Sequence, residues 1–163
     1  MKKLTMLLMS GVLMFGAVAC SNPQTAANAP DSTKDAAKAP TADETQANQQ
    51  DATSETRRQQ ANADIKAREE RNNALNGGAA ENRSDGDIES EVRSKLEVNI
   101  PASALVVKSD KGVVTVSGTV PKQEQLAKIQ TEAAKIKGVK SVNVKATVAA
   151  PKADSKDNKS KAQ

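Results

Sequence analysis

The sequence predicts an α+β protein in which one small domain, residues 84–150, lies between a long polar N-terminal segment and a short polar tail. Three patterns carry this prediction. Apolar residues recur at helical spacing in two segments, two β-branched runs flank a tight-turn sequence, and a last run alternates apolar and polar residues. We therefore expect the order α-β-β-α-β, with both helices on one face of a three-stranded mixed sheet.

The first helix of the domain is expected to begin at Ser84 or Asp85, either of which can cap it with a side-chain oxygen. Its apolar residues stand four positions apart and therefore share one face: Ile88, Val92 and Leu96. Pro101 cannot continue a helix, so the chain is expected to turn there.

A β-hairpin is predicted next. Residues 105–108 form its first strand, Asp110-Lys111-Gly112 is a tight-turn sequence, and residues 113–117 return as the second strand. Val114 and Val116 fall on one face of the returning strand, which we expect to face the core.

A second helix and a final strand complete the domain. The helix carries apolar residues at steps of three and four and is expected to end at Gly138; they are Leu126, Ile129, Ala133 and Ile136. The final strand alternates throughout. It is expected to turn Val142, Val144, Ala146 and Val148 inward, and Ser141, Asn143, Lys145 and Thr147 outward.

Residues 1–19 have the layout of a secretory signal peptide. Lys2 and Lys3 form the positive region, residues 4–18 form an apolar run, and small residues close the segment at Ala17-Val18-Ala19. The run is too short for a stable transmembrane helix.

Two processing routes fit this N-terminus. Ala17-Val18-Ala19 satisfies ordinary signal peptidase, which would leave a free periplasmic protein. With Cys20 it also resembles a lipobox, in which the cysteine is acylated. Because Cys20 is the only cysteine and cannot form an internal disulfide, the lipid anchor is favoured. Ser21 is not an aspartate, which by resemblance to lipoproteins favours the periplasmic face of the outer membrane.

Residues 20–83 are read as a lipidated cysteine followed by a disordered stalk. Ile65 and Leu75 are the only apolar side chains in it apart from alanine, too few to offset the entropy of ordering. Residues 53–75 are rich in helix formers but lack an apolar stripe, so we expect a transient, solvated helix. A flexible stalk of this length would span roughly 45 Å. The basic tail, residues 151–163, is also expected to be disordered.

Composition argues against nucleic-acid binding. The formal net charge is only +4, from 24 basic and 20 acidic residues, and no basic stripe is present. The chain has no Trp or Tyr, and Phe15 lies in the signal segment, so no aromatic side chain is available to stack on bases.

Composition also argues against an enzyme. There is no histidine, and acylation would consume Cys20, which leaves carboxylates and lysines for acid–base chemistry. The acidic cluster at the start of the first helix complements the helix dipole, and we favour that structural role over a catalytic or metal-binding one; its members are Asp85, Asp87, Glu89 and Glu91. We therefore expect no catalytic residue, metal or cofactor.

The ordered set DGDIESEVRSKL, DKGVVTVSGTV and IKGVKSVNVKATV resembles a BON domain, the family named for bacterial osmotically induced proteins and nodulation-related secretins. The resemblance covers residues 84–150 and implies attachment to phospholipid membranes, with a role in envelope integrity or osmotic stress tolerance. It also leaves open a small-ion or osmotic sensor. A protein-interaction adaptor that reaches envelope proteins is the rival class.

Four lysines are the candidate membrane contacts, each able to contribute on the order of 1 kcal/mol at an anionic surface. They are Lys108, Lys111, Lys140 and Lys145, on the open face and one end of the predicted sheet. The more common role of such lysines is to keep an exposed sheet soluble and to protect its edges. Both readings remain open from the sequence.

Overall fold

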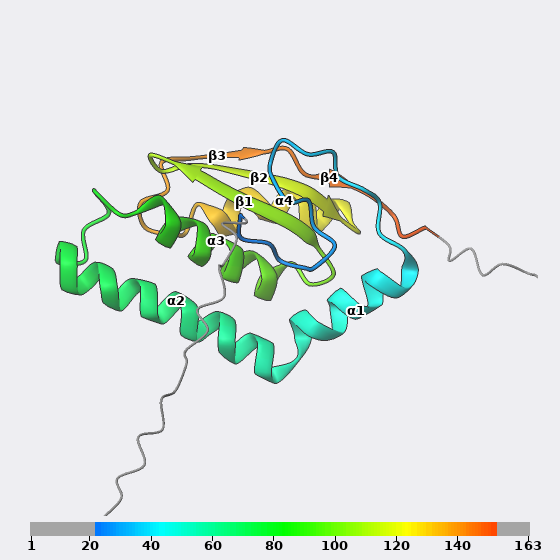
Figure 1. Cartoon of the computed structure of the whole chain (residues 1–163), viewed down its shortest axis with the longest axis horizontal. Helices are drawn as coiled ribbons and strands as arrows, with labels where there is room; N and C mark the ends of the chain where they lie inside the picture. The colour runs from blue at the N-terminus through cyan, green and yellow to red at the C-terminus, as the bar shows by residue number, and fades with distance from the viewer. Residues whose placement is uncertain (1–21, 153–163) are drawn as a thin grey trace, which may run out of the picture.

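The computed structural model describes residues 22–152, so the signal segment, Cys20 and residues 153–163 lie outside the described part. Within it the chain forms four helices and four strands (Figure 1). The helices are α1 (Ala42–Thr53), α2 (Glu55–Asn76), α3 (Asp85–Asn99) and α4 (Gln123–Ala133). The strands are β1 (Ala104–Asp110), β2 (Val113–Val120), β3 (Ser141–Val144) and β4 (Thr147–Val148). The predicted α+β class is confirmed.

The sheet is mixed, with β2 at its centre. β1 pairs with β2 as the predicted antiparallel hairpin, in which Val107 faces Val116. β3 and β4 both pair with β2 in parallel on its other side. The Asp110-Lys111-Gly112 turn closes the hairpin through positive φ angles of 52° at Lys111 and 82° at Gly112.

The final strand differs from the expectation because it is interrupted between β3 and β4. Val144 pairs with Val116 and Thr147 with Thr119, so the register is the same on both sides of the break. Ala146 is buried as expected, but Val144 and Val148 remain 36% and 41% exposed. Their pairing places them on the core side of the sheet, but β3 and β4 form its edge and these two side chains remain partly exposed.

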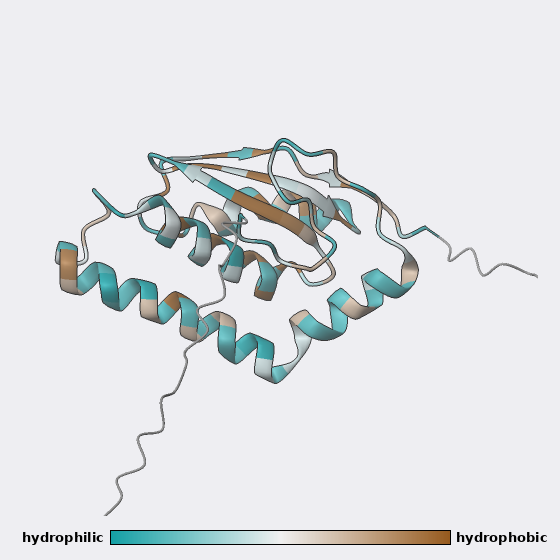
Figure 2. Cartoon of the chain, viewed as in Figure 1, coloured by the Kyte–Doolittle hydropathy of each residue, from teal (hydrophilic) through white to brown (hydrophobic). Residues whose placement is uncertain are grey.

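The core lies between the sheet and one layer made by α3 and α4, as predicted. α3 contributes Ile88, Val92 and Leu96, and α4 contributes Ile129 and Ala133. α4 ends at Ala133, earlier than expected, and turns carry the chain on to Gly138. Ile136, in these turns, still packs against the core. Figure 2 shows the hydrophobic colour concentrated on the strands, whereas α1 and α2 are largely hydrophilic.

The expected disorder of the N-terminal stalk is wrong for residues 22–83. Thr41 and Glu44 cap α1 reciprocally, with hydrogen bonds of 3.1 and 2.7 Å between backbone amides and side-chain oxygens. Ser54 caps α2, and Gly77 ends it at a φ of 60°. α2 is exposed over much of its surface, but one side of it lies along α3 (Figure 1). An apolar stripe is indeed absent, but polar contacts hold the helix.

The segment before α1 extends the sheet at the free edge of β1. The amide of Thr25 donates to the carbonyl of Leu105 at 2.8 Å, and the amide of Val107 donates to the carbonyl of Pro23 at 2.9 Å. The Thr25 hydroxyl also accepts from the Leu105 amide at 2.9 Å. The chain thus pairs its own N-terminal segment with an edge that would otherwise be open.

The same segment then crosses the sheet face that points away from the helices. The Ser117 hydroxyl donates to the carbonyl of Thr33 at 3.1 Å. Val106 points to this outer face and is nevertheless fully buried. The outer face is therefore covered over part of its length and is not the open surface that the sequence suggested.

The start of the tail is also ordered. The Lys152 amide donates to the carbonyl of Pro40 at 2.9 Å, and the Ala42 amide donates to the carbonyl of Lys152 at 3.0 Å. The expectation of disorder from residue 151 onward is therefore wrong at Lys152, which backbone hydrogen bonds fix beside the start of α1.

Candidate functional site

Lys111 and Lys140 come together at the closed end of the hairpin. The Lys140 amide donates to the carbonyl of Gly112 at 2.8 Å, so the chain leaving Gly138 runs beside the turn. The two lysines line a hollow of about 260 Å³, together with Asp85, Arg83 and their neighbours. Two of the four predicted lysines thus share one surface.

Asp85 fixes the shape of this hairpin end. Its carboxylate accepts hydrogen bonds from the Ser109 hydroxyl at 2.6 Å and from the Lys111 and Gly112 amides at 2.8 and 3.0 Å. Burial alone would raise the pKa of Asp85, but these hydrogen bonds lower it below its ordinary value. The first residue of α3 therefore holds the turn as an ionised carboxylate and presents Lys111 in a fixed position.

Lys108 lies on β1, close to the same end, but its charge is compensated. Its ammonium group contacts the Glu89 carboxylate at 2.9 Å, and that hydrogen bond raises the pKa of Lys108. Glu89 also accepts from the Ser109 amide at 2.9 Å. Lys108 is thus tied to α3 and offers less free charge than Lys111 or Lys140.

Lys145 lies apart from the other three. Its amide donates to the Val116 carbonyl at 2.8 Å, at the break between β3 and β4. Its side chain lines a separate hollow of about 570 Å³, between the outer face of the sheet and residues 33–37, where Lys34 is the other cationic residue. The structure therefore divides the predicted set into Lys111 with Lys140, compensated Lys108, and remote Lys145.

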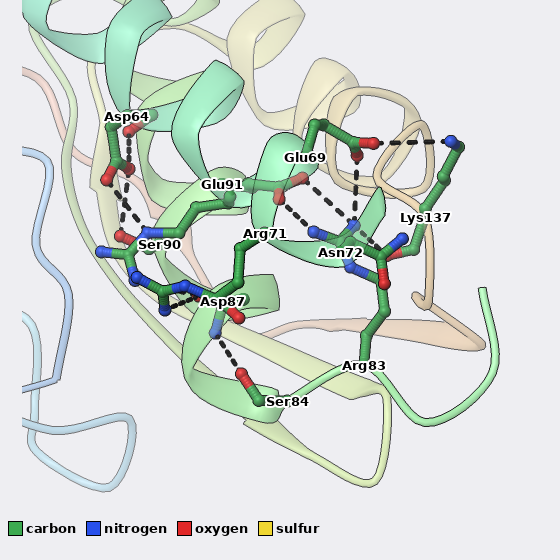
Figure 3. A network of polar contacts seen from close by, with 12 residues as sticks. Asp64, Glu69, Arg71, Asn72, Arg83, Ser84, Asp87, Ser90, Glu91 and Lys137 are labelled. Carbon is green, nitrogen blue, oxygen red and sulfur yellow. Dashed lines mark hydrogen bonds and ion pairs between the residues drawn. The ribbon is translucent and has the colours of Figure 1, made fainter. Parts of the chain in front are cut away.

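Sequence reasoning missed a buried ion pair between Arg83 and Glu91 (Figure 3). The Arg83 and Glu91 side chains are 1% and 0% exposed. Arg83 also donates to the carbonyl of Lys137 at 2.9 Å and to Glu69 at 3.2 Å. Burial raises the pKa of Glu91, against the opposing effect of Arg83. No periodicity in the sequence marks Arg83 as a residue of the interior.

The polar contact between α2 and α3 was also missed. Asp64 accepts hydrogen bonds from the Ser90 and Ser94 hydroxyls at 3.0 and 2.9 Å. Asp87 on α3 accepts from Arg68 and Arg71 on α2, both at 2.9 Å. A signal exists in the sequence, since polar and small residues recur at steps of four, three, four and four; they are Arg57, Ala61, Asp64, Arg68 and Asn72.

A comparison with protein-family models decides the identity of the hairpin-bearing unit. The model described as the BON domain matches residues 84–150. These residues are a BON domain. No curated protein and no solved structure matches the chain. BON domains are a non-catalytic binding family associated with membrane phospholipids and osmotic stress proteins.

The acidic residues at the start of α3 all form hydrogen bonds or ion pairs within the protein. Asp85 accepts hydrogen bonds from the hairpin turn. The other three carboxylates pair with cationic side chains; they are Asp87, Glu89 and Glu91. Across residues 22–152, no group of three or more potential ligand side chains is arranged to hold a metal ion. In the same range, no helix is both long and apolar enough to cross a bilayer.

The docking of α2 on the BON domain should depend on pH. Burial raises the pKa values of Asp64 and Asp87, but hydrogen bonds lower both below their ordinary value of 3.8; the donors are Ser94, Ser90 and Arg68 for Asp64, and Arg68 and Ser84 for Asp87. A carboxylate whose pKa is lower in the folded than in the unfolded protein stabilises the folded state when the pH is above its unfolded-state pKa. This stabilisation is lost as the pH falls through the folded-state pKa. The pKa of Glu91 is raised in the folded protein, so the contribution of Glu91 to stability has the opposite dependence on pH.

We therefore expect amide protection of α2 to hold at neutral pH and to fall below about pH 4. Hydrogen exchange across a pH series measures it, after correction for intrinsic exchange rates. Replacing Asp64 and Asp87 together with Asn should weaken docking at neutral pH and flatten the acid transition. Full α2 protection down to pH 2 would contradict the assignment of these two carboxylates.

Proposed function

We propose that this BON domain binds anionic phospholipid surfaces through the hairpin end that carries Lys111 and Lys140. The observation that carries the proposal is their convergence on one hollow, while neither side chain forms an ion pair within residues 22–152. Two free ammonium groups at a projecting turn match the phosphate groups of a lipid surface. The proposed role is non-enzymatic and serves envelope integrity or osmotic stress tolerance.

The hairpin end is favoured as the membrane-contact surface because the outer face of the sheet is partly covered. Residues 22–37 pair with the edge of β1 and cross the outer face, so they stand between much of that face and any membrane. Lys145 faces the hollow beneath this segment. The hairpin end, in contrast, is made by loops and a turn with exposed Lys111 and Lys140.

Acylation of Cys20, which we propose as the anchor, would hold this end close to the bilayer. Cys20 precedes Asn22 by two residues, a length of chain that can span at most about 7.6 Å. Pro23 is already paired with Val107, and the hairpin turn lies roughly 13 Å further along β1 at about 3.3 Å per residue. The proposed outer-membrane lipoprotein would thus hold its BON domain at the membrane surface, without a long flexible tether.

The protein's own contribution to membrane affinity should be small and electrostatic. Residues 22–152 contain no aromatic side chain to anchor at the interface. Two lysines supply on the order of 2 kcal/mol together. The lipid on Cys20 would then provide most of the residence time by holding the domain near the surface.

Replacing Lys111 and Lys140 together with Gln should weaken binding to vesicles containing anionic lipid roughly 30-fold at low salt. Co-sedimentation with residues 22–163 measures this without the anchor. Lys122→Gln with Lys128→Gln is the matched control, because it removes the same charge from the exposed side of α4 and its start. Equal losses in both variants would show a general charge effect and defeat the proposed surface. Adding Lys108→Gln and Lys145→Gln should change binding little further.

A protein-interaction adaptor is the second candidate. It is favoured by the way this fold accepts its own N-terminal segment as an added strand on β1, which is a common mode of peptide recognition. If the wild-type protein does not bind anionic vesicles at low salt, the adaptor function replaces phospholipid binding.

A further inference from the structure

The contact between α2 and α3 has little apolar content. Only Ala61 and Asn72 are buried in α2, and Leu75 is 74% exposed. α3 meets α2 through Asp87, Ser90, Ser94 and Glu97, which are polar or charged (Figure 3 shows the end nearer Asp87). Little of the free energy of docking can therefore come from the burial of apolar surface.

Ion pairs take the place of apolar contacts along the whole length of α2. Asp87 of α3 forms ion pairs with Arg68 and Arg71 of α2. Glu97 of α3 forms an ion pair with Arg57 of α2. A further pair joins Asp64 of α2 to Arg93 of α3 at 3.3 Å. Glu69 of α2 pairs with Arg83 and Lys137, which lie in the loops before α3 and after α4, at 3.2 and 3.4 Å. Several of the basic side chains are partly exposed, with Arg71 at 53%, so that salt can screen them.

α3 does not need α2 in order to stay in place. Its opposite face inserts Ile88, Val92 and Leu96 into the core of the BON domain. Two of its ion pairs involve no residue of α2: Glu91 with Arg83, and Glu97 with Arg93 at 2.8 Å. The two faces of α3 are thus independent: the apolar one belongs to the domain and the polar one to α2.

Both ends of α2 are suited to movement. Ser54 separates it from α1 in an extended conformation. On the other side, Gly77, Gly78 and Asn82 have φ values of 60°, 77° and 61° in the short connection to α3. Conformationally permissive residues at these positions allow α2 to leave α3. Arg83 then loses Glu69 of α2 but keeps the Lys137 carbonyl and Glu91.

We propose that α2 is an ionic clasp on α3, closed at low ionic strength and opened as ionic strength rises. The screening length falls from about 10 Å at 0.1 M salt to about 3 Å at 1 M, which weakens attraction between partly exposed charges and leaves the apolar core unaffected. Opening uncovers Asp87 and Glu97 together with the Ser90 and Ser94 hydroxyls. Opening of the clasp thereby exposes an acidic surface of α3 that α2 covers in the closed state.

Hydrogen exchange of the full-length protein between 0.05 and 1 M NaCl tests the clasp. Protection of α2 should fall about tenfold relative to α3, β1 and β2, whose protection should not change. Sucrose at matching osmolality should not open it, because a neutral solute leaves the screening length unchanged. Protection of α2 that is independent of salt, or absent at every salt concentration, would overturn the proposal.

Two variants make the test specific. Arg68→Gln with Arg71→Gln removes both partners of Asp87 and should lower α2 protection at low salt and flatten its salt dependence. Arg58→Gln with Lys66→Gln removes the same charge from exposed positions of α2 and should behave as the wild type. Indistinguishable behaviour of the two variants would contradict the clasp. The proposal does not depend on lipid binding.

Discussion

Replacing Arg83 with Ala should destabilise the folded protein by about 3–5 kcal/mol, because it leaves the Glu91 carboxylate buried without its cationic partner. Glu91 is fully buried and Arg83 nearly so. The substitution also removes the donor to the Lys137 carbonyl, which fixes the loop after α4. Urea unfolding of residues 22–163 measures the loss as a lower midpoint at similar slope.

The double variant Arg83→Met with Glu91→Leu should recover most of the loss, since a buried ion pair can be replaced by apolar groups of similar volume at little cost. Arg58→Ala removes an exposed arginine of α2 and should change stability by less than about 0.5 kcal/mol. A fragment that begins at Ser84 matches the BON domain but lacks Arg83, so it should share the defect. If Arg83→Ala unfolds like Arg58→Ala, the buried pair does not stabilise the fold as described.

Gly118→Ala should cost about 3 kcal/mol or more. Gly118 has a φ of 123°, which side chains rarely permit, and an added Cβ would lie 2.1 Å from the carbonyl oxygen of Ala104. The clash is with the backbone of β1, so the central hairpin itself must move. Thermal or urea unfolding gives the magnitude, and broadened amide resonances in β1 and β2 would show where the strain lies.

Gly86→Ala is the matched control. Gly86 lies in α3 with open space around the position of an added Cβ, so alanine should stabilise the helix by roughly 0.5–1 kcal/mol. The same chemical change is thus expected to have opposite signs at the two glycines. A neutral Gly118→Ala would mean that β1 and β2 do not approach each other as closely as described.

Local signals made the BON domain predictable. The turn sequence Asp110-Lys111-Gly112 specifies the hairpin, and the four-residue spacing of Ile88, Val92 and Leu96 specifies the buried face of α3. The break in the last strand was not predictable in this way. It lies opposite Gly118 in a neighbouring strand, and alternation within residues 141–148 contains no information about that neighbour.

The docking of α2 could not be predicted from an apolar stripe because it has none. Its stability depends on pairs between distant segments, such as Asp64 with Ser94 or Arg68 with Asp87, and each member alone resembles a solvated polar residue. The pairing of Pro23 and Thr25 with β1 is likewise a backbone contact, which side-chain composition does not encode. The low hydrophobicity of residues 22–83 therefore predicts disorder, although polar and backbone contacts order the segment.

The candidate site was only partly accessible to sequence reasoning. The sequence predicts that the four lysines share the open face and one end of the sheet, but the convergence of Lys111 and Lys140 depends on the hydrogen bond from the Lys140 amide to the Gly112 carbonyl. The separation of Lys145 follows from the segment that crosses the outer face, which was expected to be a free stalk. The residue types were thus predictable, whereas the fold determines which of the lysines lie together.

Binding of residues 22–163 to vesicles of graded anionic-lipid content tests phospholipid binding most directly. Wild-type protein should co-sediment at low salt in proportion to anionic lipid, should not bind neutral vesicles, and should dissociate as NaCl approaches physiological ionic strength, where the screening length is about 8 Å. Equal binding to neutral and anionic vesicles, or no binding to anionic vesicles at low salt, would contradict the account.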